Sequence, residues 1–357
     1  MRPHPALAPS LVGLLFFTLL ALRVGSTDGF RYLRPIQAGE LLSRPAVLLP
    51  GQVPIRGVGY DGQFYFYIAQ DPFLRKPETA TSLDNSLRYR RILYPFLAWL
   101  LSLGQRQLLP FVLVALNVLA ATAVVTISAL AAIRAGRSPW LALAVGLFPG
   151  LWIPIMLDLT EPLQLALLAA GMLAGSSGLL LLSCLAKETS AVALLTEGAR
   201  HLLARRWRPA ARQAFALAVL AGWSLFVWRT VRAHESTLGG HLLDPPGAPF
   251  LLLARDLVPQ PARAMFLLVA VLICLLAVVR LAWARDGGAW AGAAYALVGL
   301  AAGSDTWSDP TAYFRVIAGA VVLVFPSWCL ARDRAGTILL ALGVVAGLAT
   351  AIVVLVF

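Results

Sequence analysis

The feature that most constrains this chain is a series of apolar runs, each near the length of a membrane span, that recurs along the sequence. A helix needs about 20 apolar residues to cross ~30 Å of hydrocarbon, and only helices and closed barrels satisfy their backbone polar groups there. The chain is 59% hydrophobic and 13% charged, whereas soluble domains carry roughly 25% charged residues. We therefore predict an all-α polytopic membrane protein with about 10–11 transmembrane helices, folded as one domain over residues 1–357.

The longest runs give most of the predicted spans. They are residues 108–133, 139–157, 214–231, 264–284, 289–302, 312–331 and 338–357. A first run at 11–22 follows Arg2, and either it stays as a helix or it is cleaved as a signal peptide. Because many spans follow it, we expect it to stay.

Two regions are harder to divide. Residues 162–203 are long enough for two or three spans, and the Gly-Ser-Ser-Gly sequence at 175–178 predicts a turn inside them. We divide this region into segments 162–174, 179–186 and 189–203. The run at 92–103 is too short to cross, so we expect a helix that lies at the interface and dips inward.

Arginines near the ends of the runs predict the orientation, because cytoplasmic loops carry an excess of basic residues. With the N-terminus in the cytoplasm, the inner loops receive Arg134, Arg137, Arg205, Arg206, Arg208, Arg212, Arg280, Arg285, Arg332 and Arg334. The opposite face receives a long first loop at 25–91 and the segments 158–161, 187–188, 232–263 and 304–310. Arg232, Arg255 and Arg263 run against the rule. The outer face thus holds the acidic and mixed-charge clusters, where we expect the chemistry.

The basic charge fits membrane anchoring better than nucleic-acid binding. The formal net charge is +12, but the arginines lie beside apolar runs, where they also suit anionic lipids. Only Lys76 and Lys187 are lysines among 29 basic residues, a bias typical of GC-rich bacterial genomes. We therefore predict a multi-pass protein of the bacterial inner membrane with membrane lipids, and no nucleic acid, as partners.

The metal-binding residue types form no recognised motif. Cys184, Cys274 and Cys329 lie inside apolar runs without a motif partner, which predicts buried free thiols. A second group is formed by His234, Glu235, His241 and Asp244. Its spacing differs from that of zinc hydrolases, so we expect a solvated loop rather than a metal site. No cofactor is implied, although a divalent metal elsewhere stays an open alternative.

The sharpest functional signal lies in the first loop, where residues 59–72 read GYDGQFYFYIAQDP and residues 88–95 read RYRRILYP. Helical spacing places Asp61 and Tyr65 on one face, and tyrosines suit a membrane interface. A carboxylate there can act as general base towards a hydroxyl. Arg88, Arg90 and Arg91 offer planar forks that fit phosphate. The alternative is that Asp61 caps a helix while the arginines bind lipid headgroups.

These two stretches resemble bacterial membrane proteins described as cell surface glycopolymer formation proteins. More distantly, they are similar to the mannosyltransferase family that adds the second mannose of GPI anchors. The resemblance covers residues 59–103 and implies a GT-C glycosyltransferase, which uses a polyprenyl-phosphate sugar and an acidic base in the first outer loop. It places the base at Asp61, supported by Tyr60, Gln63, Tyr65 and Tyr94.

The sequence also departs from that family. Tyr60 stands where the eukaryotic members have Trp, and Arg91-Ile92 replaces an aromatic pair. Gly62 follows Asp61, so the doubled acidic motif of some GT-C enzymes, and a metal bridging it, is not expected. Asp71 is either a second acid or, with Pro72, a helix stop.

Three outer-face clusters add candidate residues. In the 158–162 segment DLTEP, Asp158 and Glu161 resemble part of the same family's acidic motif. An acid at the edge of the hydrocarbon is a functional candidate. The alternative is that Thr160, before Pro162, starts a helix. Lys187 either holds a donor phosphate or pairs with Glu188 or Glu161. A final cluster is formed by Asp305, Asp309, Tyr313 and Arg315. If the helix that carries Arg315 starts near Asp309, Arg315 faces inward and can bind a phosphate.

Together these observations predict a glycosyltransferase that moves a sugar from a polyprenyl-phosphate donor to a cell-surface or lipid-linked glycan on the extracytoplasmic face. One alternative is a non-catalytic lipid-glycan transporter or flippase, in which charges should lie near the bilayer midplane in two related halves. Another is a subunit of an envelope-assembly complex. The sequence shows charged clusters near one face and no repeated half.

Overall fold

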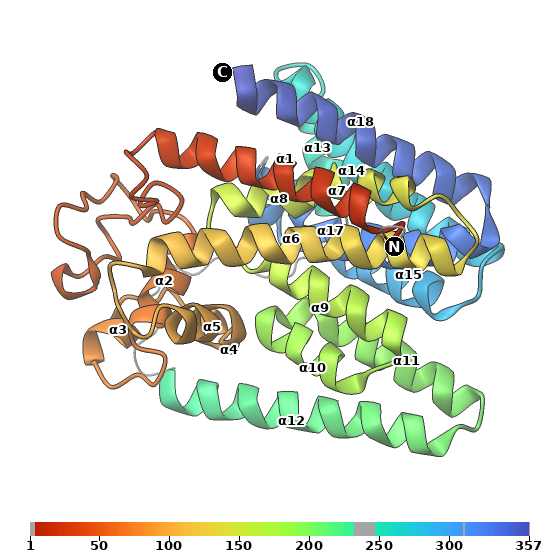
Figure 1. Cartoon of the computed structure of the whole chain (residues 1–357), viewed down its shortest axis with the longest axis horizontal. Coiled ribbons are helices and arrows are strands. Elements are labelled where there is room, and N and C mark those ends of the chain that lie inside the picture. The colour runs from red at the N-terminus through yellow and green to blue at the C-terminus, as the bar shows by residue number, and fades with distance from the viewer. Residues whose placement is uncertain (1–3, 232–246, 310, 357) are drawn as a thin grey trace.

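The computed structural model describes residues 4–231, 247–309 and 311–356 (Figure 1). Within these residues the secondary structure is helical, and β-pairing is limited to two isolated bridges that join Ala38 to Gly59 and Gly39 to Ile55. The prediction of an all-α polytopic membrane protein is confirmed, because several helices in the described part are long and apolar enough to cross a membrane.

Six such helices occur among the described residues. They are α1 (Leu7–Ser26), α6 (Leu109–Arg134), α12 (Trp207–Val231), α14 (Pro261–Val279, continued by the 3₁₀ turn Arg280–Ala282), α17 (Tyr313–Ala331) and α18 (Arg334–Val356). A seventh crossing is possible for a pair bent by 54°, in which the segment Pro139–Gly146, ending in α7 (Leu143–Gly146), meets α8 (Pro149–Met156). The bend lies at Pro149, which cannot donate the hydrogen bond that would continue the first helix.

Shorter helices lie between the long ones in the sequence. They are α9 (Glu161–Ala174), α10 (Ser177–Ala186), α11 (Ala191–Leu203) and α15 (Gly287–Leu300). The predicted turn separates α9 from α10, because Gly175 adopts a left-handed conformation with φ of 63°. A helix of 14 residues, such as α9, is only ~21 Å long at 1.5 Å per residue. The predicted number of spans therefore requires these shorter helices to cross as well.

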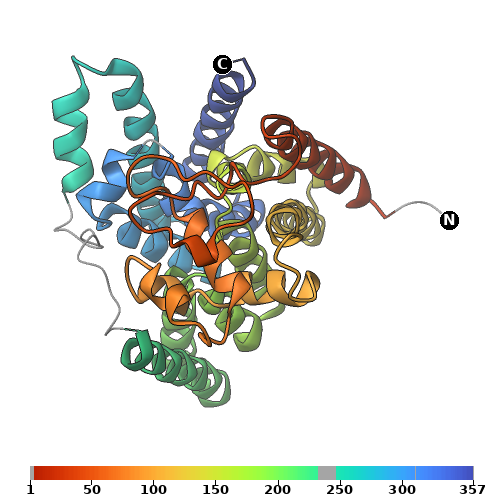
Figure 2. The ribbon, with the colours of Figure 1, turned by 90° about the vertical axis from the view of Figure 1, so that its left-hand side faces the viewer.

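The first loop is folded and lies across the ends of the helices, as Figure 2 shows from its side. It contains a 3₁₀ turn (Pro45–Val47), α2 (Gly62–Gln70), α3 (Pro77–Thr81) and α4 (Leu87–Arg90), and it leads into α5 (Leu93–Leu101). The run predicted as an interfacial helix corresponds to α5, which buries Tyr94, Pro95 and Ala98. Two further helices, α13 (Ala248–Asp256) and α16 (Ser304–Ser308), precede α14 and α17.

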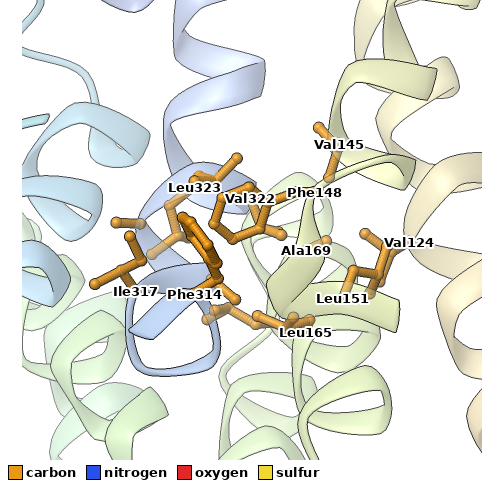
Figure 3. Packing of buried hydrophobic residues seen from close by; sticks show 14 of the residues in the cluster. Val124, Val145, Phe148, Leu151, Leu165, Ala169, Phe314, Ile317, Val322 and Leu323 are labelled. Atoms are coloured by element: carbon orange, nitrogen blue, oxygen red, sulfur yellow. The ribbon is translucent and has the colours of Figure 1, made fainter. Parts of the chain in front are cut away.

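Two hydrophobic cores hold these parts together. In the larger core, side chains such as Phe148, Leu165 and Phe314 from three parts of the chain pack against one another (Figure 3). The smaller core joins the aromatic residues of α2 to Leu113 of α6 and Val227 of α12. The first loop is therefore a packed cap on the helices, which fixes the position of the motif that it carries.

The predicted orientation can be tested with single cysteines. Glu78 is exposed on α3 of the first loop. Trp207 is 68% exposed at the N-terminal end of α12. We expect an impermeant thiol reagent to label Glu78→Cys but not Trp207→Cys in intact cells, because the positive-inside rule places these positions on opposite faces. The native cysteines are buried and free, as predicted, and should give little background. Labelling at position 207 alone would reverse the orientation.

Candidate functional site

A cavity of about 540 Å³ lies between the first loop and the ends of α11, α15 and α17. Predicted candidates from four distant parts of the chain meet in its lining. They are Tyr60, Asp61, Arg88, Arg91, Lys187, Asp309 and Arg315. Glu161 lies directly behind this lining, because it pairs with both Lys187 and Arg315. Most of the predicted site is thus assembled in one place.

Asp61 precedes α2 and pairs with an arginine of α4. Its carboxylate lies 2.8 Å from Nη2 of Arg88, and its side chain makes no capping hydrogen bond to the helix. Arg88 also donates to Asp84 through Nε at 2.9 Å and Nη2 at 2.8 Å. Burial would raise the pKa of Asp61, but the charges of Arg88, Arg315 and Arg91 outweigh burial and lower it to about 2. Asp61 is therefore ionised at neutral pH.

Arg91 connects the first loop to the turn between α10 and α11. Its guanidinium donates to both carboxylate oxygens of Glu188, with Nε at 2.8 Å and Nη2 at 2.6 Å. Its third nitrogen, Nη1, donates to the hydroxyl of Tyr65 at 2.9 Å. This fork is the bidentate geometry that also suits a phosphate group.

Glu161 holds the two cations on the inner side of the cavity. Nζ of Lys187 lies 2.7 Å from its carboxylate and Nε of Arg315 lies 3.4 Å from it. The alternative that Lys187 pairs with Glu161 is thus observed. Arg315 also donates to the hydroxyl of Tyr60 at 2.7 Å, and that hydroxyl donates to Asp309 at 2.5 Å. Arg315 therefore faces inward, as the start of α17 near Asp309 requires.

Three of the predicted supporting residues organise the loop and lie outside the cavity lining. Gln63 accepts from the backbone of Gly39 and donates to Val58, so it joins two parts of the loop. Tyr94 donates to a backbone carbonyl of α6. Asp71 ends α2 and accepts from two backbone amides of the following turn, which is the geometry of a helix stop.

Two other candidates also lie outside the lining. Arg90 is in the last turn of α4 and is not part of the cavity lining. Its carbonyl accepts a hydrogen bond from Trp223 of α12 at 3.0 Å. Trp223 stacks on Tyr89 with ring centroids 5.9 Å apart. Asp158 is fully buried in the turn between α8 and α9, without a hydrogen-bond partner among the described residues. Because Arg90 is not in the lining, this cavity does not support the phosphate contact predicted for it. A supporting role for Asp158 stays a prediction from the sequence.

Close packing explains why position 62 of the motif is a glycine. A Cβ atom added to Gly62 would lie 2.3 Å from the carbonyl oxygen of Leu157 and 2.9 Å from that of Pro35. The first turn of α2 therefore packs directly on the backbone that leads into α9, and only glycine allows this approach. The contact sets the position of Asp61 relative to Glu161.

Sequence reasoning did not select two acids of the cavity as site residues. Asp84 and Glu188 hold Arg88 and Arg91 in place. The spacing of Asp84, four residues before Arg88, was a usable signal because such pairs meet on one helical turn. The pairing of Glu188 with Arg91 joins residues 97 positions apart, and no local pattern indicates it.

The arrangement places the carboxylate of Asp61 and four cations around one cavity. Among the described residues, no group of three His, Cys, Asp or Glu side chains could hold a metal ion. His234, Glu235, His241 and Asp244 lie outside the described residues. No protein-family model, curated protein or solved structure matches this chain.

Proposed function

We propose that this protein is a GT-C-type glycosyltransferase that transfers a sugar from a polyprenyl-phosphate donor to a hydroxyl of a cell-surface or lipid-linked glycan on the extracytoplasmic face. The observation that supports this proposal best is the cavity in which Asp61 lies beside Arg88, Arg91, Lys187 and Arg315. An ionised carboxylate and a group of cations are the parts that glycosyl transfer from a phosphate leaving group requires.

In the proposed reaction, the acceptor oxygen bonds to the anomeric carbon of the sugar while the bond from that carbon to the phosphate oxygen breaks. The acceptor proton passes to the Asp61 carboxylate. The electron pair of the broken bond stays on the polyprenyl phosphate, which gains negative charge as it leaves. The guanidinium groups of Arg88 and Arg91 and the ammonium group of Lys187 stabilise this charge.

The ion pairs imply that the arginines exchange their carboxylate partners for the donor phosphate when the donor binds. In the structure the cations are held by carboxylates, with Arg88 on Asp61 and Asp84, and Arg91 on Glu188. A carboxylate with a pKa of about 2 is a weak base while this pairing lasts. A donor phosphate that draws Arg88 away would raise the basicity of Asp61. Donor binding would thus prepare the base before transfer.

The rival classes can be separated by an assay without a membrane barrier. The purified chain in detergent would be mixed with a panel of polyprenyl-phosphate sugars, including mannose, and with candidate acceptor glycans. An enzyme releases polyprenyl phosphate and forms a glycosidic product in this mixture. A flippase or an assembly subunit has no activity there. A chain that binds the donors but forms no product with any acceptor would favour these alternatives.

The fork of Arg91 gives a prediction with a control in the same motif. Arg91→Ala should weaken binding of the polyprenyl-phosphate donor by about tenfold or more, because a hydrogen bond to a charged group contributes roughly 1.5–3 kcal/mol. Arg90→Ala removes the same side chain one position earlier, outside the cavity lining, and should leave donor affinity unchanged. Binding can be measured by microscale thermophoresis, with melting temperatures to confirm folding.

Arg91→Lys separates charge from geometry in this test. It keeps the positive charge but cannot make two parallel hydrogen bonds, so its donor affinity should lie between those of the wild type and Arg91→Ala. Equal donor affinity in the Ala variants at positions 90 and 91 would argue against a phosphate contact by Arg91.

A further inference from the structure

A second and larger cavity, of about 830 Å³, lies on the other side of α17 from the candidate site. Its walls come from α1, α8, α14, α17 and α18. Most of the surface that lines it is apolar, and the apolar side chains in the lining are Val24, Ile153, Met156, Leu157, Phe266 and Phe314. Because α8 packs against both α1 and α18, it forms the floor between these two helices. A cavity with such walls suits hydrocarbon rather than water.

The charged part of this cavity is entirely basic. Arg23, Arg34 and Arg263 line it, and no acidic residue does so within the described part of the chain. Arg23 lies in the last turn of α1 and is exposed, as is Arg34 in the first loop. The nearby Asp28 accepts hydrogen bonds from the backbone amides of residues 32 to 34. Two arginines therefore face the mouth of an apolar cavity.

Arg263 has a structural role in the same wall. Its guanidinium donates to the hydroxyl of Tyr313 at 2.8 Å and to the carbonyl of Ser308 at 2.8 Å. It also lies 3.1 Å from the carboxylate of Asp256. Its charge is thus already paired, which leaves Arg23 and Arg34 as the cations available to a ligand.

We propose that this cavity binds one anionic phospholipid, with its phosphate between Arg23 and Arg34 and an acyl chain along Val24, Met156 and Phe266. Basic pockets between transmembrane helices are suited to anionic headgroups, and the apolar walls exclude a ligand without a hydrocarbon chain. The alternative to lipid binding is that each arginine side chain separately reaches the membrane surface, where its charged group is hydrated. The shared cavity favours a common ligand.

This lipid site is distinct from the proposed donor site. Thr311 lines the lipid cavity, and its hydroxyl lies 2.6 Å from that of Tyr60, which lines the candidate site. Phe314 and Arg315 are neighbours on α17, and each lines a different cavity. The two cavities thus share one wall without sharing their ligand groups, so lipid binding can be tested apart from glycosyl transfer.

Native mass spectrometry of the purified full-length protein tests this proposal. The protein would be titrated with dioleoyl phosphatidylglycerol and with dioleoyl phosphatidylcholine, which has the same chains but no net charge. We expect the wild type to retain one phosphatidylglycerol preferentially. The double variant Arg23→Gln/Arg34→Gln should bind it at least about tenfold more weakly, because two charged hydrogen-bond donors are lost.

A matched control uses two other exposed arginines of the first loop. Arg44→Gln/Arg56→Gln removes the same charge from positions outside the cavity and should retain the lipid as the wild type does. Equal loss in both double variants would show a general attraction to basic surface and would overturn the proposal. Equal retention of the two lipids by the wild type would also overturn it, as would displacement of the lipid by inorganic phosphate at the same concentration.

Discussion

Asp61→Asn should lower the rate of glycosyl transfer by about 10²–10⁴-fold, the range typical for the loss of a general base. Asparagine keeps the shape of the side chain but cannot take the acceptor proton. The fold should tolerate the change, because Arg88 keeps its paired hydrogen bonds to Asp84. Turnover would be measured as release of polyprenyl phosphate at saturating donor.

A pH series of melting temperatures gives this variant an independent readout. The folded-state pKa of Asp61 is about 2, below the usual value of about 3.9 in an unfolded chain. Its ion pair therefore contributes stability that is full above about pH 4 and is lost as the pH falls towards 2. The wild type should melt above Asp61→Asn at neutral pH, and the gap should close in acid. Near-normal turnover in the variant would make Asp61 structural and direct the search for the base to Glu161, which lies behind the same lining.

Lys187→Met should destabilise the protein by about 3–5 kcal/mol, because it leaves Glu161 as a buried carboxylate without its nearest partner. The side chains of Lys187 and Glu161 are 11% and 4% exposed, so the contact is largely shielded from water. Arg315, at 3.4 Å, should keep the effect near the lower end of that range. Thermal unfolding in detergent measures the change.

The double variant Glu161→Gln/Lys187→Met distinguishes stability from function. It removes both buried charges, so it should recover most of the stability lost in Lys187→Met. Donor binding should stay weak if Lys187 holds the phosphate. Recovery of both stability and donor affinity would mean that Lys187 serves only to neutralise Glu161.

The helices could be predicted closely because lipid imposes one strong requirement, a long apolar run. The run predicted at 108–133 is Leu109–Arg134 in the structure, and that at 312–331 is Tyr313–Ala331. Even the difficult region at 162–203 divides near its predicted positions, since a left-handed conformation at Gly175 ends α9. The sequence did not show the bend of 54° between α7 and α8, because one continuous span was expected over residues 139–157.

The sequence allowed many residues of the candidate site to be predicted, but few of the ion pairs and contacts between them. Asp61, Lys187 and Arg315 each stand out because a charge beside an apolar run is costly unless it has a partner. Which partner each one has depends on packing between distant segments. Thus the fork from Arg91 to Glu188 and the contact of Gly62 with Leu157 appear only in three dimensions.

The stacking of Trp223 on Tyr89 links the site to a helix at the edge of the molecule. In Figure 1, α12 runs along the lower border, and much of its surface faces outward. A helix of 25 residues adapts to a thinner bilayer by tilting. Because Trp223 also donates a hydrogen bond to the carbonyl of Arg90, such a tilt would pull on α4 and the arginines that it positions. We therefore expect the geometry around Asp61 to respond to bilayer thickness, and activity measured in lipids of different chain length would test this expectation.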